Sequence, residues 1–246
     1  SHYIHLRAEL CTDTLVEELH EFSPNDRVGL VSLMDHTPGQ RQFRDTEKLR
    51  VYLMGKHGYD DVGVEAHIDR LKNMQAVYLD KHRAAAVAYA KEMGAVLASH
   101  DDTTVDDVIA SSGEGVTVAE FPTTSKAATA CRAHGQYIVM GAPNIIRGGS
   151  HSGNVAAHDL ANNGLLDILS SDYVPASLLN AAVTLGMLME DMAAGIRKVT
   201  AVPADAAGFD DRGRIAPEKR ADLVRFAVHE GLPMISSVWV GSARVA

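Results

Sequence analysis

The sequence predicts an α/β protein in which parallel strands and helices alternate to form most of a TIM-like (β/α)8 barrel. Two observations support this. Short apolar segments alternate with longer segments of helical periodicity, and polar side chains capable of chemistry follow nearly every apolar segment. With 246 residues and 46% hydrophobic content, the chain is long enough to bury a large core.

The apolar segments are the expected strands, at residues 3–10, 27–34, 94–99, 116–121, 137–140 and 165–170. Their mixed composition is typical of parallel strands that are covered on both faces. The expected helices are residues 12–22, 63–93, 104–111, 125–133, 154–163 and 175–199. An open doubly wound sheet has the same alternation, so periodicity alone does not distinguish it from a barrel.

Polar residues at the strand ends favour the barrel, because the loops at the carboxyl ends of barrel strands converge on one face. These residues are Glu9, Asp35, His36, His100, Asp101, Glu120, Asn144, Arg147 and Asp172. A closed barrel needs eight strands. We therefore expect two further strands before those of this chain.

The chain is expected to change character at Gly208. A turn cluster at residues 210–213 is followed by strand-like segments at residues 221–226 and 236–240, with Gly-Leu-Pro at 231–233 between them. We therefore expect a barrel domain at residues 1–207 and part of a small β-sandwich at residues 208–246.

Residues 39–59 are polar and carry five basic side chains: Arg41, Arg44, Lys48, Arg50 and Lys56. One interpretation is a solvated mobile loop, since loops are commonly charged and mobile. The other is a basic lid over an anionic ligand.

Composition excludes several classes of protein. A net charge of −9 argues against non-specific nucleic-acid binding, and no apolar run approaches the ~20 residues that cross a bilayer. Cys11 and Cys131 are too few for a disulfide framework. We expect a cytoplasmic protein with two ordinary thiols, no nucleic-acid partner and no membrane partner. Homo-oligomer formation is left open.

Five strand-end residues are candidate metal ligands: Glu9, His36, His100, Glu120 and Asp172. Imidazole and carboxylate ligands suit zinc, as one or two ions, with manganese or magnesium as alternatives. Asp172 is also the candidate catalytic residue, because a carboxylate near a cation can accept a proton from water. The alternative is that Asp172 caps the helix expected from Pro175.

Residues 141–154 form the most unusual stretch of the chain. Glycines allow close approach to a ligand, Arg147 can bind phosphate through two bonds, and a helix follows. The candidate substrate-binding residues are Asn144, Arg147, Gly148, Gly149, Ser150 and His151. The alternative is a glycine-rich turn with a helix cap. The spacing of a Walker loop is absent, as are the GxSxG, HExxH and CxxC motifs.

Taken together, residues 33–43, 98–102, 119–124, 141–154 and 168–175 resemble the PhnM family. Its members are similar in fold to dihydroorotase and N-acetylglucosamine-6-phosphate deacetylase, in the amidohydrolase superfamily. Residues 213–224 also resemble the return of that superfamily into its β-sandwich, although Glu218 stands where glycine is usual.

The resemblance implies metal-dependent hydrolysis of a small phosphorylated sugar, α-D-ribose 1-methylphosphonate 5-triphosphate, to the 5-phosphate and diphosphate. It also implies that Glu9, His100 and Asp172 match metal ligands after strands three, five and eight. Glu120 stands where the superfamily usually has histidine, and His36 could bind metal or substrate. Two alternatives remain: a deaminase or cyclic-amide hydrolase of the same superfamily, and a non-catalytic barrel fragment.

Overall fold

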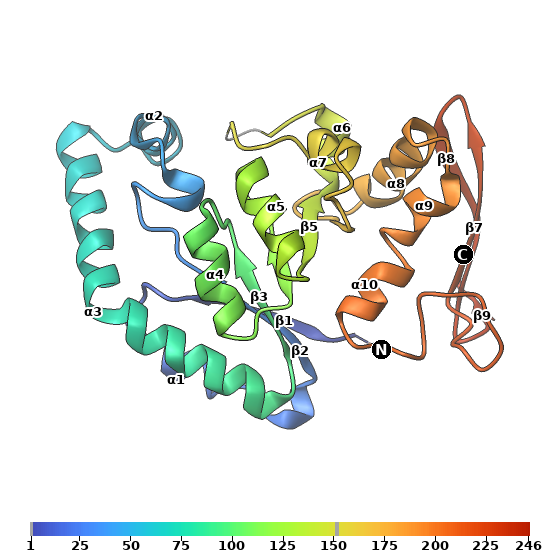
Figure 1. Ribbon diagram of the computed structural model, residues 1–246, viewed down its shortest axis with the longest axis horizontal. Coiled ribbons are helices and arrows are strands. Elements are labelled where there is room, and N and C mark those ends of the chain that lie inside the picture. The colour runs from blue at the N-terminus through green and yellow to red at the C-terminus, as the bar shows by residue number, and fades with distance from the viewer. Residues whose placement is uncertain (1, 151–152) are drawn as a thin grey trace. The chain divides into compact units, whose positions relative to one another are not determined.

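The computed structural model describes residues 2–150 and 153–246 (Figure 1). It divides into two compact units, one ending at Gln136 and one comprising Tyr137–Ala246. Among the described residues, no helix is both long and apolar enough to cross a membrane. Cys11 and Cys131 are free thiols, as expected.

Four parallel strands form the sheet of the first unit, in the order of the chain (Figure 1). They are β1 (Ile4–Glu9), β2 (Val28–Met34), β3 (Val96–His100) and β4 (Val118–Glu120). The register pairs Glu9 with Met34 and His100 with Glu120. The carboxyl ends of these strands therefore lie along one edge of the sheet, where the polar residues follow.

The helices of the first unit are α1 (Leu15–Leu19), α2 (Thr46–His57), α3 (Asp61–Met93), α4 (Val105–Gly113) and α5 (Ser125–Ala133), with short 3-10 helices at Pro24–Asp26 and Arg41–Phe43. Caps set several of the boundaries. The Asp60 side chain accepts from the Gly63 amide at the start of α3, and Gly94 ends that helix at φ 64°. Helix α1 is shorter than the helix expected at residues 12–22, because Thr14 is its N-cap and His20 is its C-cap.

The interpretation of residues 39–59 as a loop is wrong, because α2 occupies most of that segment. Asp45 caps α2, and the apolar side chains of Leu49 and Leu53 pack against Val64 and Ile68 of α3. Val51, Tyr52 and Met54 of this helix are exposed, so its apolar residues do not form one buried face, and helical periodicity does not predict it.

The main core of the first unit lies between the sheet and α3. Buried side chains from both include Val31 and Leu33 of β2 and Ala86 and Ala90 of α3. This packing buries the middle of the strands, and the polar residues of the site follow at their carboxyl ends.

The second unit contains the parallel strands β5 (Tyr137–Gly141) and β6 (Ile168–Ser170). Its helices are α6 (Ala142–Arg147), α7 (Ala157–Asn162), α8 (Ser177–Leu188), α9 (Met192–Arg197) and α10 (Ala201–Ala206). The single helix expected at residues 175–199 is wrong, because the chain turns at Glu190, φ 52°, between α8 and α9. A Cβ at Gly195 would lie 2.3 Å from the Ala182 carbonyl oxygen, so glycine permits this close packing.

A three-stranded antiparallel sheet ends the chain, formed by β7 (Leu223–His229), β8 (Leu232–Val240) and β9 (Ala243–Arg244). The expected β appendage is confirmed, although of the segment 231–233 only Gly231 lies in the turn, and Leu232 and Pro233 begin β8. Glu218 has φ 66°, the left-handed region that favours glycine. The α/β class is confirmed, and closure into a barrel stays a prediction.

Candidate metal centre

A fixed turn after β2 presents His36. The buried carboxylate of Asp35 accepts a hydrogen bond from the Thr37 amide at 3.0 Å and one from Gln75 Nε2 of α3 at 2.6 Å. These bonds lower the pKa of Asp35 despite the opposing effect of burial. The neighbouring imidazole is thereby carried on a turn that is anchored to both the strand and a helix.

The imidazole of His36 lies between two carboxylates. Its Nδ1 is 2.8 Å from Glu9 Oε2, and its Nε2 is 3.9 Å from Asp101 Oδ2. An ionised carboxylate can only accept, so Nδ1 donates to Glu9. In the neutral ring, Nε2 then keeps its lone pair and faces Asp101.

His100 repeats this arrangement at the end of β3. Its Nδ1 is 3.4 Å from Glu120 Oε2, and its Nε2 is 3.3 Å from Asp101 Oδ2. Glu120 in turn accepts from the Ser32 hydroxyl at 2.6 Å. Both imidazoles therefore hold a carboxylate at Nδ1 and turn Nε2 toward the same oxygen.

Burial and neighbouring charges shift the pKa values of His100 and Glu120 in opposite directions. Burial lowers the pKa of His100, but the hydrogen bond to Glu120 and the negative charges of Asp101 and Glu120 raise it overall. Burial raises the pKa of Glu120, while His100, His5 and Ser32 lower it to a net decrease. The site therefore favours cationic charge next to ionised Glu120.

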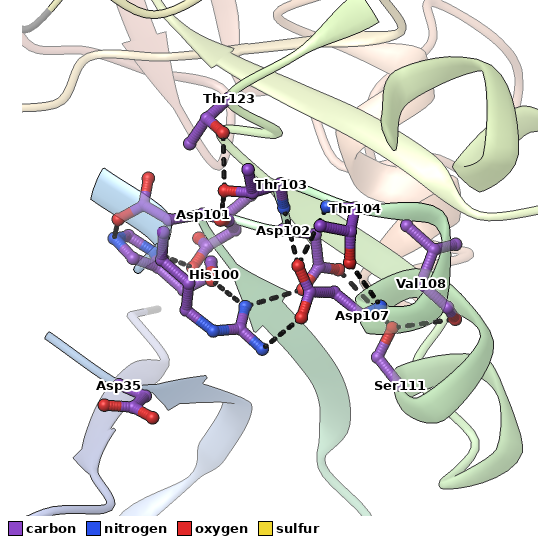
Figure 2. Close-up of polar contacts among 12 residues, drawn as sticks. Asp35, His100, Asp101, Asp102, Thr103, Thr104, Asp107, Val108, Ser111 and Thr123 are labelled. Atoms are coloured by element: carbon purple, nitrogen blue, oxygen red, sulfur yellow. Dashed lines mark hydrogen bonds and ion pairs between the residues drawn. The ribbon is translucent and has the colours of Figure 1, made fainter. Parts of the chain in front are cut away.

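Asp101 supplies the shared oxygen. It is 4% exposed, has φ 56°, and its Oδ2 has no hydrogen-bond partner among the described residues. Burial raises the pKa of this carboxyl, although His100, His36 and Arg41 oppose the rise. A buried carboxylate oxygen of this kind calls for a cation. Figure 2 shows Asp101 beside His100 at the end of β3.

His36, His100 and Asp101 can together hold a metal ion, since one ligand atom from each lies within 4.8 Å of the others. Two imidazole nitrogens and one carboxylate oxygen are a donor set that fits a divalent cation. The structure therefore contains a candidate metal centre, and the residues present fit such an ion.

The structure brings together four of the five predicted ligands. His36 and His100 belong to the candidate group, Glu9 contacts His36, and Glu120 contacts His100. Whether Glu9 and Glu120 bind metal themselves stays a prediction. Sequence reasoning placed Asp101 at a strand end and gave it no role. Its position directly after His100 was the available signal.

Asp172 lies in the second unit, after β6. It is exposed, has φ 49°, and lies so near Gly141 that a Cβ there would be 3.0 Å from Asp172 Oδ2. The alternative role as a helix cap is wrong, because Ala176 is the N-cap of α8. Its roles in metal binding and catalysis stay predictions.

The predicted phosphate-binding residues also lie in the second unit. Helix α6 occupies the start of the stretch and ends at Gly148, φ 77°. Arg147 is exposed and donates to the Tyr173 hydroxyl at 3.2 Å, while Asn144 Oδ1 accepts from the Ala157 amide at 2.9 Å. Substrate binding by Asn144, Arg147, Gly148, Gly149 and Ser150 stays a prediction. His151 lies outside the described residues.

Fold and site together define an α/β protein with a candidate metal centre at the carboxyl ends of its parallel strands. No family model matches the chain. It is 44% identical over 247 aligned positions to the α-D-ribose 1-methylphosphonate 5-triphosphate diphosphatase of Escherichia coli (strain K12). The chain is a homologue of that hydrolase, which confirms the resemblance to the PhnM family. The match covers 99% of this chain and 65% of the relative, so the chain spans under two thirds of the relative's length.

Solved structures are more distant. An uncharacterized protein aligns with a TM-score of 0.52 at 19% identity, over 68% of this chain and 50% of that one, and shares the fold alone. N-isopropylammelide isopropylaminohydrolase from Burkholderia multivorans ATCC 17616 aligns at 14% identity, over 89% of this chain and 71% of that one. Its TM-score of 0.47 does not establish a shared topology.

Proposed function

We propose that the chain is the larger part of a metal-dependent diphosphatase that hydrolyses α-D-ribose 1-methylphosphonate 5-triphosphate to the 5-phosphate and diphosphate. One observation carries the proposal. The Nε2 atoms of His36 and His100 both face a buried oxygen of Asp101 that has no hydrogen-bond partner among the described residues. This geometry occurs in a chain that is homologous to that enzyme.

We further propose that the parallel strands belong to a (β/α)8 barrel at residues 1–207, followed by part of a β-sandwich at residues 208–246. The strand-helix alternation of both units supports the first assignment. The antiparallel sheet β7–β9 supports the second.

His36 Nε2, His100 Nε2 and Asp101 would hold the cation, which is zinc in our proposal. Such an ion supplies Lewis acidity for phosphoryl oxygens and makes water more acidic. Glu9 and Glu120 hold the two rings by accepting from Nδ1, which keeps each Nε2 available. Orienting carboxylates of this kind fix the tautomer as well as the direction of the ring.

We assign the remaining roles by resemblance. Asp172 would accept a proton from the attacking water, and Arg147 would offset charge on the phosphates through its guanidinium. The exposure of both side chains in the second unit leaves them accessible. Gly148, with φ 77°, ends α6 and turns the chain into the stretch that contains Gly149 and Ser150.

Phosphorus NMR of the reaction products tests the function. The protein, supplied with zinc and the triphosphate substrate, should release diphosphate and the 5-phosphate in equal amounts. Release of single phosphates would contradict the proposal. Release of ammonia from amine or cyclic-amide substrates, with the triphosphate left intact, would favour the deaminase or cyclic-amide hydrolase alternative.

A further inference from the structure

Arg41 is a buried arginine that contacts the turn carrying two of the candidate ligands. It is 9% exposed, and its Nη1 donates to the His100 carbonyl oxygen at 2.8 Å and to Asp102 Oδ1 at 2.7 Å. Its Nη2 is 3.7 Å from Asp107 Oδ1. Figure 2 shows Asp102 and Asp107 side by side near the start of α4.

Arg41 itself belongs to the loop that carries the other imidazole. The 3-10 helix Arg41–Phe43 follows β2, and the Gly39 amide donates to the Phe43 carbonyl at 2.9 Å, which closes this loop on itself. The Phe43 ring packs edge-on against His36, with ring centroids 6.1 Å apart. One short segment therefore contacts His36 through Phe43 and the backbone of His100 through Arg41.

Asp102, the partner of Arg41, is itself bonded to α4 and to the loop after β4. Its second oxygen accepts from the Ser111 hydroxyl of α4 at 3.4 Å, and its carbonyl accepts from the Thr123 amide at 2.9 Å. Asp102 is 1% exposed, so a change at Arg41 would leave a buried carboxylate without its cation. The turn at Asp101 is held from the side of α4 and from the loop after β4.

The backbone conformations of Arg41 and Asp101 are a second, independent sign that these two turns are held in place by their contacts. Arg41 and Asp101 have φ of 49° and 56°, values that side chains other than glycine rarely adopt. Such conformations persist where surrounding contacts hold them. The contact of Arg41 with the His100 carbonyl lies directly beside the Asp101 turn, which directs the shared oxygen toward both imidazoles.

We infer that Arg41 is a positioning residue that ties the loop carrying His36 to the turn carrying His100 and Asp101, and so sets the spacing of a divalent-cation site. The inference rests on the proposed metal centre. It removes Arg41 from the basic lid predicted at residues 39–59, because a guanidinium bound to Asp102 beneath the surface is not available to an anionic ligand. The two bonds from Nη1 and the approach of Nη2 need a planar fork that lysine lacks.

The test compares Arg41→Lys with Arg50→Lys. Arg50 is a matched control, since it lies in the same part of the chain and pairs with Asp61 and Glu65, at the surface and away from the ligands. Two measurements are made on the purified chain: hydrogen exchange of residues 98–104 without metal, and the affinity and visible absorption of bound Co²⁺. Arg41→Lys should exchange several times faster at residues 98–104, bind Co²⁺ about tenfold more weakly and change its absorption spectrum. Arg50→Lys should match the wild type in each.

A folded Arg41→Lys variant with wild-type exchange and an unaltered Co²⁺ spectrum would overturn the inference alone. A wild-type chain that binds no Co²⁺ would overturn the proposed metal centre and this inference with it. If Arg41→Lys does not fold, Asp102→Asn is tested in its place. The Asn variant weakens the ion pair with Arg41 and leaves the bond from Arg41 to the His100 carbonyl in place. Faster exchange and weaker Co²⁺ binding in Asp102→Asn would support the inference, and wild-type behaviour would refute it.

Discussion

The rings of His36 and His100 lie nearly perpendicular, with centroids 5.5 Å apart and an angle of 77° between their planes. They come from the ends of neighbouring parallel strands, β2 and β3. The Nδ1 of His36 donates to Glu9 and that of His100 to Glu120, while the Nε2 of each ring faces Asp101. This geometry makes the role of Asp101 the first point to test.

We expect Asp101→Asn to separate metal binding from folding. The substitution removes a buried charge with an incomplete set of partners, so the metal-free chain should lose little stability or gain some. Zinc should raise the Tm of the wild type and have little effect on the variant, as followed by differential scanning fluorimetry. Asp106→Asn, an exposed carboxylate in the first turn of α4, is the control and should respond to zinc like the wild type. An equal zinc response in Asp101→Asn would exclude this residue as a ligand.

His100→Ala should abolish hydrolysis and also destabilise the metal-free chain. Glu120 is 7% exposed and would lose the imidazole from its buried carboxylate, at a cost of about 1–3 kcal/mol. Adding Glu120→Gln to His100→Ala should recover part of this stability, because the neutral amide is less costly to bury. Urea unfolding of the wild type, both single variants and the double variant measures the effect. Strictly additive losses would show that the two side chains do not depend on each other.

The strands were the most predictable part of the fold. Each of the six apolar segments expected in the barrel overlaps an observed parallel strand, because strands that are buried on both faces appear in the sequence as continuous apolar runs. Helices α2 and α6 were not predicted, because the apolar residues of α2 do not form one buried face and α6 begins a glycine-rich stretch. For the site, strand ends indicated His36 and His100. The contact of Arg41 with Asp102 joins residues far apart in the sequence, and no local pattern encodes it.

The capping box of α4 should make stability depend on pH. Thr104 accepts from the Asp107 amide, and the Asp107 carboxylate accepts from the Thr103 and Thr104 amides. Burial raises the pKa of Asp107, but these bonds and the charge of Arg41 lower it overall. Because folding lowers the pKa of Asp107, this carboxylate contributes its full stabilisation at pH values above the pKa of an unfolded Asp, near 4. The stabilisation is lost as the pH falls through the lower pKa of the folded state. Asp107→Ala should therefore cost about 1 kcal/mol at pH 7 and less at pH 3, measured by urea unfolding. An equal cost at both pH values would contradict this account.

Glu218→Gly should stabilise the chain or leave its stability unchanged. The left-handed conformation of Glu218, φ 66°, costs a side chain about 1–2 kcal/mol, whereas glycine adds about 0.5–1 kcal/mol of backbone entropy to the unfolded state. The difference favours glycine by up to about 1.5 kcal/mol. Ala216→Gly, two residues earlier and outside the left-handed region, is the control and should only destabilise. Thermal unfolding distinguishes them, and a Glu218→Gly variant that loses as much as Ala216→Gly would show that φ carries no strain there.

Arg147→Ala should weaken the binding of a triphosphate far more than it affects folding. The side chain is exposed and its contact with the Tyr173 hydroxyl, at 3.2 Å, is a surface interaction, so the change in unfolding free energy should stay within about 0.5 kcal/mol. Loss of a guanidinium from a phosphate should lower affinity about tenfold or more, since charge-assisted bonds contribute roughly 1.5–3 kcal/mol. Tyr173→Phe removes the hydroxyl and keeps the arginine, and it should bind inorganic tripolyphosphate like the wild type in calorimetry. If Arg147→Ala instead loses stability and retains affinity, the glycine-rich stretch that follows α6 is a structural turn and the phosphates bind elsewhere.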